Sequence, residues 1–161
     1  MNNQDLNFLD AIRMAIGAEE SAAAFYDEAA KKTMNPLGRE LLGQLADFER
    51  YHHTKLLALE DSLCSNGACI MYQGRELEFP VPDEVEKIKE ADRMSAMGII
   101  DSAIEIKRKA EERYAALAEQ TSDPDGQAMF QRLAKEEHAN RRVLEDAYWS
   151  LNDRGVWIPP E

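Results

Sequence analysis

The chain has 161 residues, 31 of them acidic and 19 basic, and a formal net charge of -12 at pH 7. This length suffices to bury the core of one domain, here residues 1–161, without disulfides or a structural metal. Nucleic acids and anionic membranes bind basic surfaces, so we expect neither as a partner of this acidic chain. The first residues lack the pattern of a secretory leader, and no apolar run has membrane-spanning length, so we expect a cytoplasmic protein.

The first half of the chain predicts a helical hairpin over residues 5–64. Apolar side chains recur at steps of three and four over residues 6–32, which is typical of one face of a helix. Asn35 and Pro36 then supply a capping residue and a proline at the first position of a second helix, expected over residues 36–63.

A connector is expected over residues 65–93, with glycines and prolines and a short helix over residues 83–92. This length can cross a whole bundle, which a tight turn cannot. Cys64 and Cys69 are the only cysteines, and two thiols cannot form a four-thiolate centre. They are either free thiols or the two halves of a reversible disulfide that closes a small loop.

The second half predicts another hairpin over residues 94–152, with helices over 95–119 and 124–151. Asp123 and Pro124 stand at its turn as Asn35 and Pro36 do at the first. The apolar tail, residues 153–161, is expected to dock on a surface. Two helical hairpins joined by one long crossover predict an all-α, ferritin-like four-helix bundle.

The two hairpins are copies of each other at an ungapped offset of 88 residues. Sixteen positions are identical at this offset between residues 12 and 67, far more than two unrelated amphipathic hairpins would share. The identities include helix faces, turn residues and caps, so we infer an internal duplication.

Glu49 and His52 lie three residues apart, so both side chains can reach one ion from the same helix face. Bundles that hold two metal ions use one glutamate from each of two helices and a Glu-x-x-His pair from each of the other two. The first hairpin has the full pattern: Glu19 is the glutamate from one helix, and Glu49 and His52 are the Glu-x-x-His pair from the other. At the offset of 88, Glu137 repeats Glu49, but Lys107 stands for Glu19 and Asn140 for His52.

Several motifs carry a resemblance to a known family. They are Ile16-Gly-Ala-Glu19, Phe25-Tyr26, Leu45-Ala-Asp-Phe-Glu49-Arg-Tyr-His52, Tyr114 and Leu133-Ala-Lys-Glu-Glu137. With these motifs both hairpins resemble the rubrerythrin-like branch of the ferritin-like, di-iron carboxylate superfamily, without the connector, the tail or a rubredoxin module.

The resemblance implies a role for each matching residue. Glu19 would be a terminal metal ligand and His52 a ligand of the same ion. Glu49 and Glu137 would be bridging carboxylates. Tyr26 and Tyr114 would form hydrogen bonds with these carboxylates.

Lys107 and Asn140 both replace ligands of the second metal position, which leaves three alternatives. One ion of iron, manganese or zinc binds at Glu19, Glu49, His52 and Glu137, with the ammonium of Lys107 in place of the second ion. Alternatively, ion pairs with Lys107 hold a metal-free site. In the third, Glu111 or, weakly, the Asn140 amide oxygen completes a dinuclear site.

Two other histidines are close to the predicted ligands in sequence. His53 could replace His52 after a small helix rotation, although the repeat favours His52. His138 lies about 100° around the helix from Glu137, and we expect it at the surface.

Two functions follow. The first is a ferritin-like metal-binding protein with a degenerate di-iron site. The alternative is a rubrerythrin-type oxidoreductase that acts on peroxide or dioxygen, with electrons from a redox partner protein. By analogy with the family we also expect a homodimer.

Overall fold

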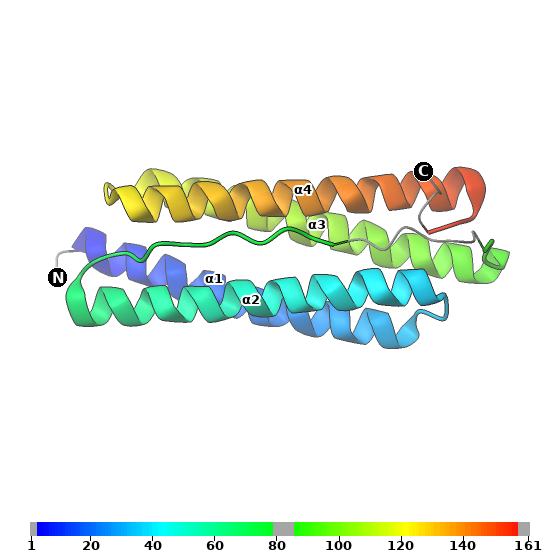
Figure 1. Cartoon of the computed structure of the whole chain (residues 1–161), viewed down its shortest axis with the longest axis horizontal. Helices are drawn as coiled ribbons and strands as arrows, with labels where there is room; N and C mark the ends of the chain where they lie inside the picture. Colours follow the sequence, from blue (N-terminus) through cyan, green and yellow to red (C-terminus); the bar gives the residue numbers. More distant parts are fainter. Residues whose placement is uncertain (1–2, 79–85, 158–161) are drawn as a thin grey trace.

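A computed structural model describes residues 3–78 and 86–157. It contains four helices: α1 (Asn3–Lys32), α2 (Pro36–Asn66), α3 (Glu90–Gln120) and α4 (Pro124–Arg154). Helices α1 and α2 form one antiparallel hairpin and α3 and α4 another, and residues 67–78 of the connector run along the bundle between α2 and α4 (Figure 1). The predicted all-α four-helix bundle with a long crossover is confirmed. Within the described residues, no helix is long and apolar enough to cross a membrane.

The helix ends follow from local hydrogen bonds at duplicated positions. The side chain of Asn35 accepts a hydrogen bond from the backbone N–H of Gly38, and that of Asp123 accepts from Asp125 and Gly126. At the other ends, Gly67 and Gly155 adopt φ angles of 70° and 68°, a conformation that glycine adopts without a steric penalty. Helices α2 and α4 therefore begin and end with the same kinds of cap.

The third helix differs from its predicted extent. It begins at Glu90, five residues earlier than expected, and residues 86–89 are not helical. The prediction of a separate short helix over residues 83–92 is therefore wrong for residues 86–89, and residues 90–92 belong to the first turn of α3. Residues 83–85 lie outside the described residues.

The end of each hairpin packs against the turn of the other hairpin. The indole of Trp157, just after α4, packs against Gly38 at the start of α2, and a Cβ atom on that glycine would overlap it. The thiol of Cys69, just after α2, packs in the same way against Gly126 at the start of α4. Both contacts are related by the offset of 88 residues. The described part of the predicted tail, residues 153–157, thus docks through Trp157, which is 2% exposed. Residues 158–161 lie outside the described residues.

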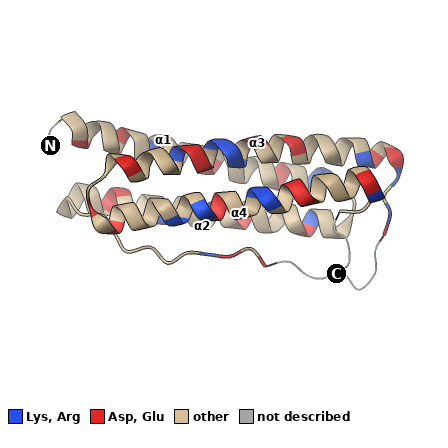
Figure 2. Cartoon of the chain, turned by 90° about the horizontal axis from the view of Figure 1, so that it is seen from above, with Lys and Arg blue, Asp and Glu red and all other residues tan. Residues whose placement is uncertain are grey.

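The bundle has two apolar core regions with a polar layer between them. One region contains Leu42, Ile100 and Leu144, and the other contains Leu56 and Phe130. Along every helix, the predicted metal ligands and the two residues that replace ligands, Lys107 and Asn140, lie between positions that belong to the two regions. Other acidic and basic residues are interspersed along the helices (Figure 2), where several form exposed ion pairs that contribute little to stability.

Candidate metal centre

The polar layer brings together charged side chains from all four helices. Helix α1 contributes Glu19, α2 contributes Glu49 and His52, α3 contributes Lys107 and α4 contributes Glu137. Each of these side chains is at most 2% exposed. Burying so many ionisable groups is costly unless they are paired or bind an ion.

The four predicted ligands meet at one point. One ligand atom from each of Glu19, Glu49, His52 and Glu137 lies within 4.8 Å of all the others. Nδ1 of His52 is 3.0 Å from Oε1 of Glu137 and 3.7 Å from Oε2 of Glu19. Donors that bind one metal at about 2.0–2.2 Å are separated by distances of this order.

The hydrogen-bond inventory also fits a cation. Oε2 of Glu19, both carboxylate oxygens of Glu137 and both ring nitrogens of His52 are buried without a hydrogen-bond partner among the described residues. Buried polar atoms normally have partners. Three carboxylates and an imidazole form a donor set suited to a divalent iron, manganese or zinc ion.

Lys107 lies on the opposite side of two of these carboxylates. Its ammonium forms a hydrogen-bonded ion pair with Glu49, and Nζ is 3.1 Å from Oε2 of Glu137. The ammonium also lies 5.5 Å from the ring centroid of Tyr26. A fixed positive charge thus stands at the end of the cluster where the repeat would place a fourth carboxylate.

The two repeated tyrosines behave differently. Tyr114 donates a hydrogen bond to Glu19, as expected from the resemblance. The hydroxyl of Tyr26 has no hydrogen-bond partner among the described residues, contrary to that expectation. The repeat explains the difference, because the counterpart of the Tyr114–Glu19 pair is Tyr26–Lys107. An ammonium offers no acceptor for the Tyr26 hydroxyl and lies over its ring instead.

The pKa values of the buried ligand side chains are shifted in different directions. Burial opposes ionisation of Glu19, but hydrogen bonds within the cluster lower its pKa to about 2. Burial and the neighbouring carboxylates Glu137 and Glu19 raise the pKa of Glu49 well above its usual value. Burial alone would lower the pKa of His52, but Glu136 and Glu137 raise it. Without a metal, the cluster therefore retains protons, which a bound cation would displace.

The remaining candidate residues lie outside the four-residue cluster. Asn140 is buried at 2% exposure, and its amide nitrogen has no hydrogen-bond partner among the described residues. Glu111 is turned to the outside, where it pairs with His138 at 3.0 Å and Arg141 at 2.9 Å. His138 is exposed, as expected, and His53 is half-buried next to the fully buried His52.

The sequence interpretation missed Glu136 and the part of the connector that binds it. Glu136 is 4% exposed and accepts hydrogen bonds from the hydroxyl of Tyr72 and the backbone N–H of Arg75. The repeat identifies its neighbour Glu137 as the counterpart of Glu49, whereas Glu136 has no glutamate as its counterpart. One signal was available, because Phe48, its counterpart at the offset of 88, is a large apolar residue and indicates a buried position.

Two cavities differ in their relation to the cluster. A cavity of about 210 Å³ between α1 and α3 is lined by Glu19 and Glu49 at the cluster and by Ala110, Lys109 and Arg113 on α3. It connects two of the ligand residues with the molecular surface.

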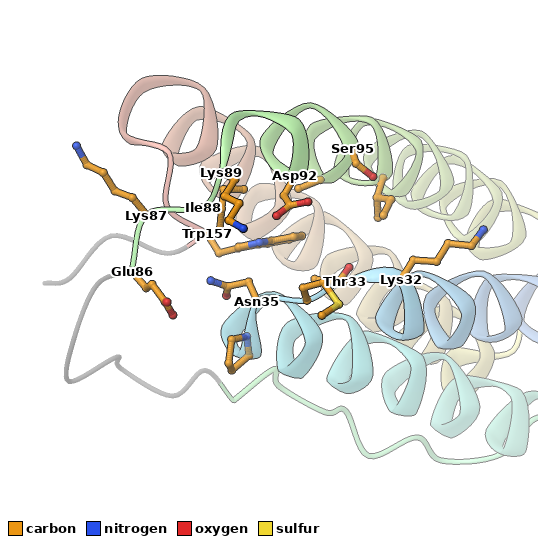
Figure 3. Close-up of a pocket in the computed structure, with 14 residues that line it drawn as sticks. Lys32, Thr33, Asn35, Glu86, Lys87, Ile88, Lys89, Asp92, Ser95 and Trp157 are labelled. Atoms are coloured by element: carbon orange, nitrogen blue, oxygen red, sulfur yellow. The ribbon is translucent and has the colours of Figure 1, made fainter.

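The second cavity, of about 430 Å³, lies at the end of the bundle where Trp157 docks (Figure 3). The described residues that line it include none of the four predicted ligands. Its buried Thr33 donates its hydroxyl to the carbonyl of Ala29. We therefore assign the candidate chemistry to the central cluster.

Both cysteines are free thiols in this structure. Cys64 is exposed, whereas Cys69 is half-buried against Gly126. Burial, together with the nearby carboxylate of Asp123, raises the pKa of the Cys69 thiol to about 11. Cys69 is accordingly a weak nucleophile at neutral pH, and its role in the described structure is packing.

Comparisons with known proteins agree with the fold. A family model described as Rubrerythrin matches residues 10–148, a range that includes both hairpins and all four predicted ligands. A solved structure of a hypothetical protein from Pyrococcus furiosus is similar, with a TM-score of 0.70 and 27% sequence identity. The similarity covers 91% of this chain and 90% of that chain. No curated protein matches the sequence.

Proposed function

Because the chain belongs to the rubrerythrin family, we propose that it binds a single divalent metal ion at Glu19, Glu49, His52 and Glu137. The ammonium of Lys107 takes the place of the second ion of a dinuclear centre. The observation that carries this proposal is the position of Lys107, which pairs with Oε1 of Glu49 and Oε2 of Glu137, while Nδ1 of His52 faces the other oxygen of each carboxylate.

The charge balance supports one ion. Among the four predicted ligands and Lys107, three ionised carboxylates and one ammonium leave two negative charges when His52 is neutral. One divalent cation neutralises them, and a second would leave a buried excess of positive charge. Iron, manganese and zinc all accept this donor set, and iron would add the capacity to exchange electrons.

Metal stoichiometry tests the proposal directly. Protein purified without chelator, and then loaded separately with iron(II), manganese(II) or zinc(II), should contain about one ion per chain by elemental analysis. His52→Ala should abolish tight binding, whereas His53→Ala, which changes the adjacent half-buried histidine, should preserve it. Two ions per wild-type chain, or none with any of the three metals, would refute the mononuclear proposal.

A reconstruction variant tests the place of Lys107. Lys107→Glu combined with Asn140→His restores the carboxylate and imidazole that the repeat lacks. We expect the stoichiometry to rise towards two ions per chain, because the added ligands replace a fixed positive charge. An unchanged stoichiometry in a folded double variant would contradict the assignment of Lys107 to the second metal position.

The second candidate function is reduction of peroxide or dioxygen at bound iron, which the cavity between α1 and α3 favours. This opening leads to Glu19 and Glu49 and is lined partly by the small side chain of Ala110. Reduction of one hydrogen peroxide to two water molecules consumes two electrons and two protons. An external donor would supply the electrons, since the two cysteines cannot form a rubredoxin-type centre.

Peroxide consumption by iron-loaded protein with an added reductant tests this candidate. Ala110→Leu should slow the reaction by narrowing the opening while the iron content stays the same. Ala116→Leu makes the same change at an exposed position of α3 and serves as the control. If the iron-loaded wild-type protein consumes no peroxide above the free-iron background, peroxide reduction is refuted.

A further inference from the structure

The imidazole of His52 lies between two sets of carboxylates. Nδ1 faces the candidate metal cluster, at 3.0 Å from Glu137, 3.7 Å from Glu19 and 3.9 Å from Glu49. Nε2 faces a different residue, Glu136, whose Oε2 lies 3.7 Å away. The two ring nitrogens therefore have separate surroundings, and only Nδ1 points to the four-residue cluster.

Glu136 is fixed from the side of the connector. The hydroxyl of Tyr72 lies 2.9 Å and 2.8 Å from its two carboxylate oxygens, and the backbone N–H of Arg75 donates to Oε1 at 2.6 Å. Nε of Arg132, one turn earlier on α4, lies 4.0 Å from Oε2. These contacts hold the carboxylate in one orientation, with Oε2 on the side of His52.

The connector is itself anchored to α2 across the same region. The hydroxyl of Tyr51 donates to the backbone carbonyl of Gln73 at 2.5 Å. The guanidinium of Arg75 lies 5.6 Å from the ring centroid of Phe48 and 5.7 Å from that of Tyr51. The segment from Tyr72 to Arg75 therefore spans from the helix that bears His52 to the helix that bears Glu136.

The internal repeat links Glu136 to the histidine specifically. At the offset of 88 residues, Asn140 is the counterpart of His52, and Phe48 is the counterpart of Glu136. The symmetry-related pair of positions, Asn140 on α4 and Phe48 on α2, thus lacks both the histidine and the carboxylate that would face its second ring nitrogen. A general stabilising role for Glu136 would not explain why the two replacements occur together.

We infer that Glu136, held by Tyr72 and the backbone of Arg75, is a positioning residue for His52: its carboxylate lies 3.7 Å from Nε2, where it can accept the Nε2–H once Nδ1 binds the metal, and it so directs Nδ1 to the metal. A histidine ligand normally donates its other N–H to a carboxylate, carbonyl or water, which fixes its tautomer and orientation. Glu136 does not belong to the converging ligand set itself. The inference rests on the proposed metal binding, and it makes the connector a structural part of the metal centre.

Zinc affinity in three variants tests the inference. Glu136→Gln keeps the size of the side chain but removes its charge, and should weaken zinc binding by about 10- to 100-fold. Tyr72→Phe removes one hydrogen bond to Glu136 and should weaken binding less. Glu145→Gln changes an ion-paired glutamate elsewhere on α4 and should leave the affinity unchanged. Circular dichroism establishes that each variant is folded.

Nitrogen-15 NMR of the zinc-loaded wild-type protein supplies a readout that a merely structural role would not change. We expect His52 to bind zinc through Nδ1 and to show an Nε2–H protected from exchange with water. This signal should shift or exchange faster in Glu136→Gln and in Tyr72→Phe. A proton on Nδ1, or a zinc affinity within about twofold of wild type in both variants, overturns the positioning role. Absence of binding of zinc, iron(II) and manganese(II) by the wild type overturns the proposed function and the inference with it, so the two failures are distinguishable.

Discussion

Replacing Lys107 by methionine removes a buried positive charge while nearly preserving the volume of the side chain. In the metal-free protein, the ammonium pairs with both Glu49 and Glu137, and all three side chains are at most 2% exposed. Loss of one partner from such a buried ion pair costs about 3–5 kcal/mol, because the remaining charge is left uncompensated. We therefore expect Lys107→Met to lower the free energy of unfolding of the metal-free protein by this amount at pH 7.

Urea denaturation followed by circular dichroism measures this loss. Lys109→Met is the matched control, because Lys109 is exposed on the same helix, and its effect should be within about 0.5 kcal/mol. If the ammonium substitutes for an ion, zinc should stabilise Lys107→Met more than the wild type. A loss below about 1 kcal/mol in the metal-free variant would show that Lys107 does not compensate the buried carboxylates.

Two further predictions concern pH and packing. The pKa values of His52 and Glu49 are raised in the folded metal-free protein. In the unfolded chain these groups lose their protons near their ordinary pKa values of 6.5 and 4.5, whereas the folded protein keeps the protons to higher pH. The stability that these protons provide is complete below those values and is lost as the pH rises through the folded-state pKa values. The melting temperature of the metal-free protein should thus fall as the pH rises above 6.5, and the increase caused by zinc should grow, because binding displaces the protons. A melting temperature of the metal-free protein that rises with pH in this range, measured by differential scanning calorimetry, would contradict this. Gly38→Ala should cost about 1–3 kcal/mol because its Cβ overlaps the indole of Trp157, and should cost almost nothing in a Trp157→Ala background. Equal costs in both backgrounds, measured by urea denaturation, would refute the proposed contact.

The sequence predicted those features of the fold that depend on neighbouring residues. Asn35 and Asp123, each followed by proline, determine where α2 and α4 begin, since their side chains cap the first turn. The beginning of α3 was predicted less well. Lys89 at its N-terminus forms no side-chain cap, so no residue pattern marked the start of the helix.

The repeat located the candidate site because its members lie at fixed positions on helix faces. For Glu136 the repeat gave only one indirect signal, the apolar counterpart Phe48, because the contacts that bury Glu136 depend on where the connector lies. Tyr72 reaches Glu136 from 64 residues away through an extended segment without a helical period. The loss of the Tyr26 hydrogen bond was also missed, because the expectation copied the geometry of the Tyr114–Glu19 pair onto a position where Lys107 offers no acceptor.

The packing of the end of each hairpin against the turn of the other has a consequence for the order of folding. Contacts within each hairpin are local in sequence and can form early, whereas Trp157 meets Gly38, and Cys69 meets Gly126, only after the two hairpins dock. Substitutions at these four positions should therefore leave the folding rate almost unchanged and accelerate unfolding. The last described residue of the chain would then govern how long the docked bundle persists, although it lies far from the metal centre in sequence.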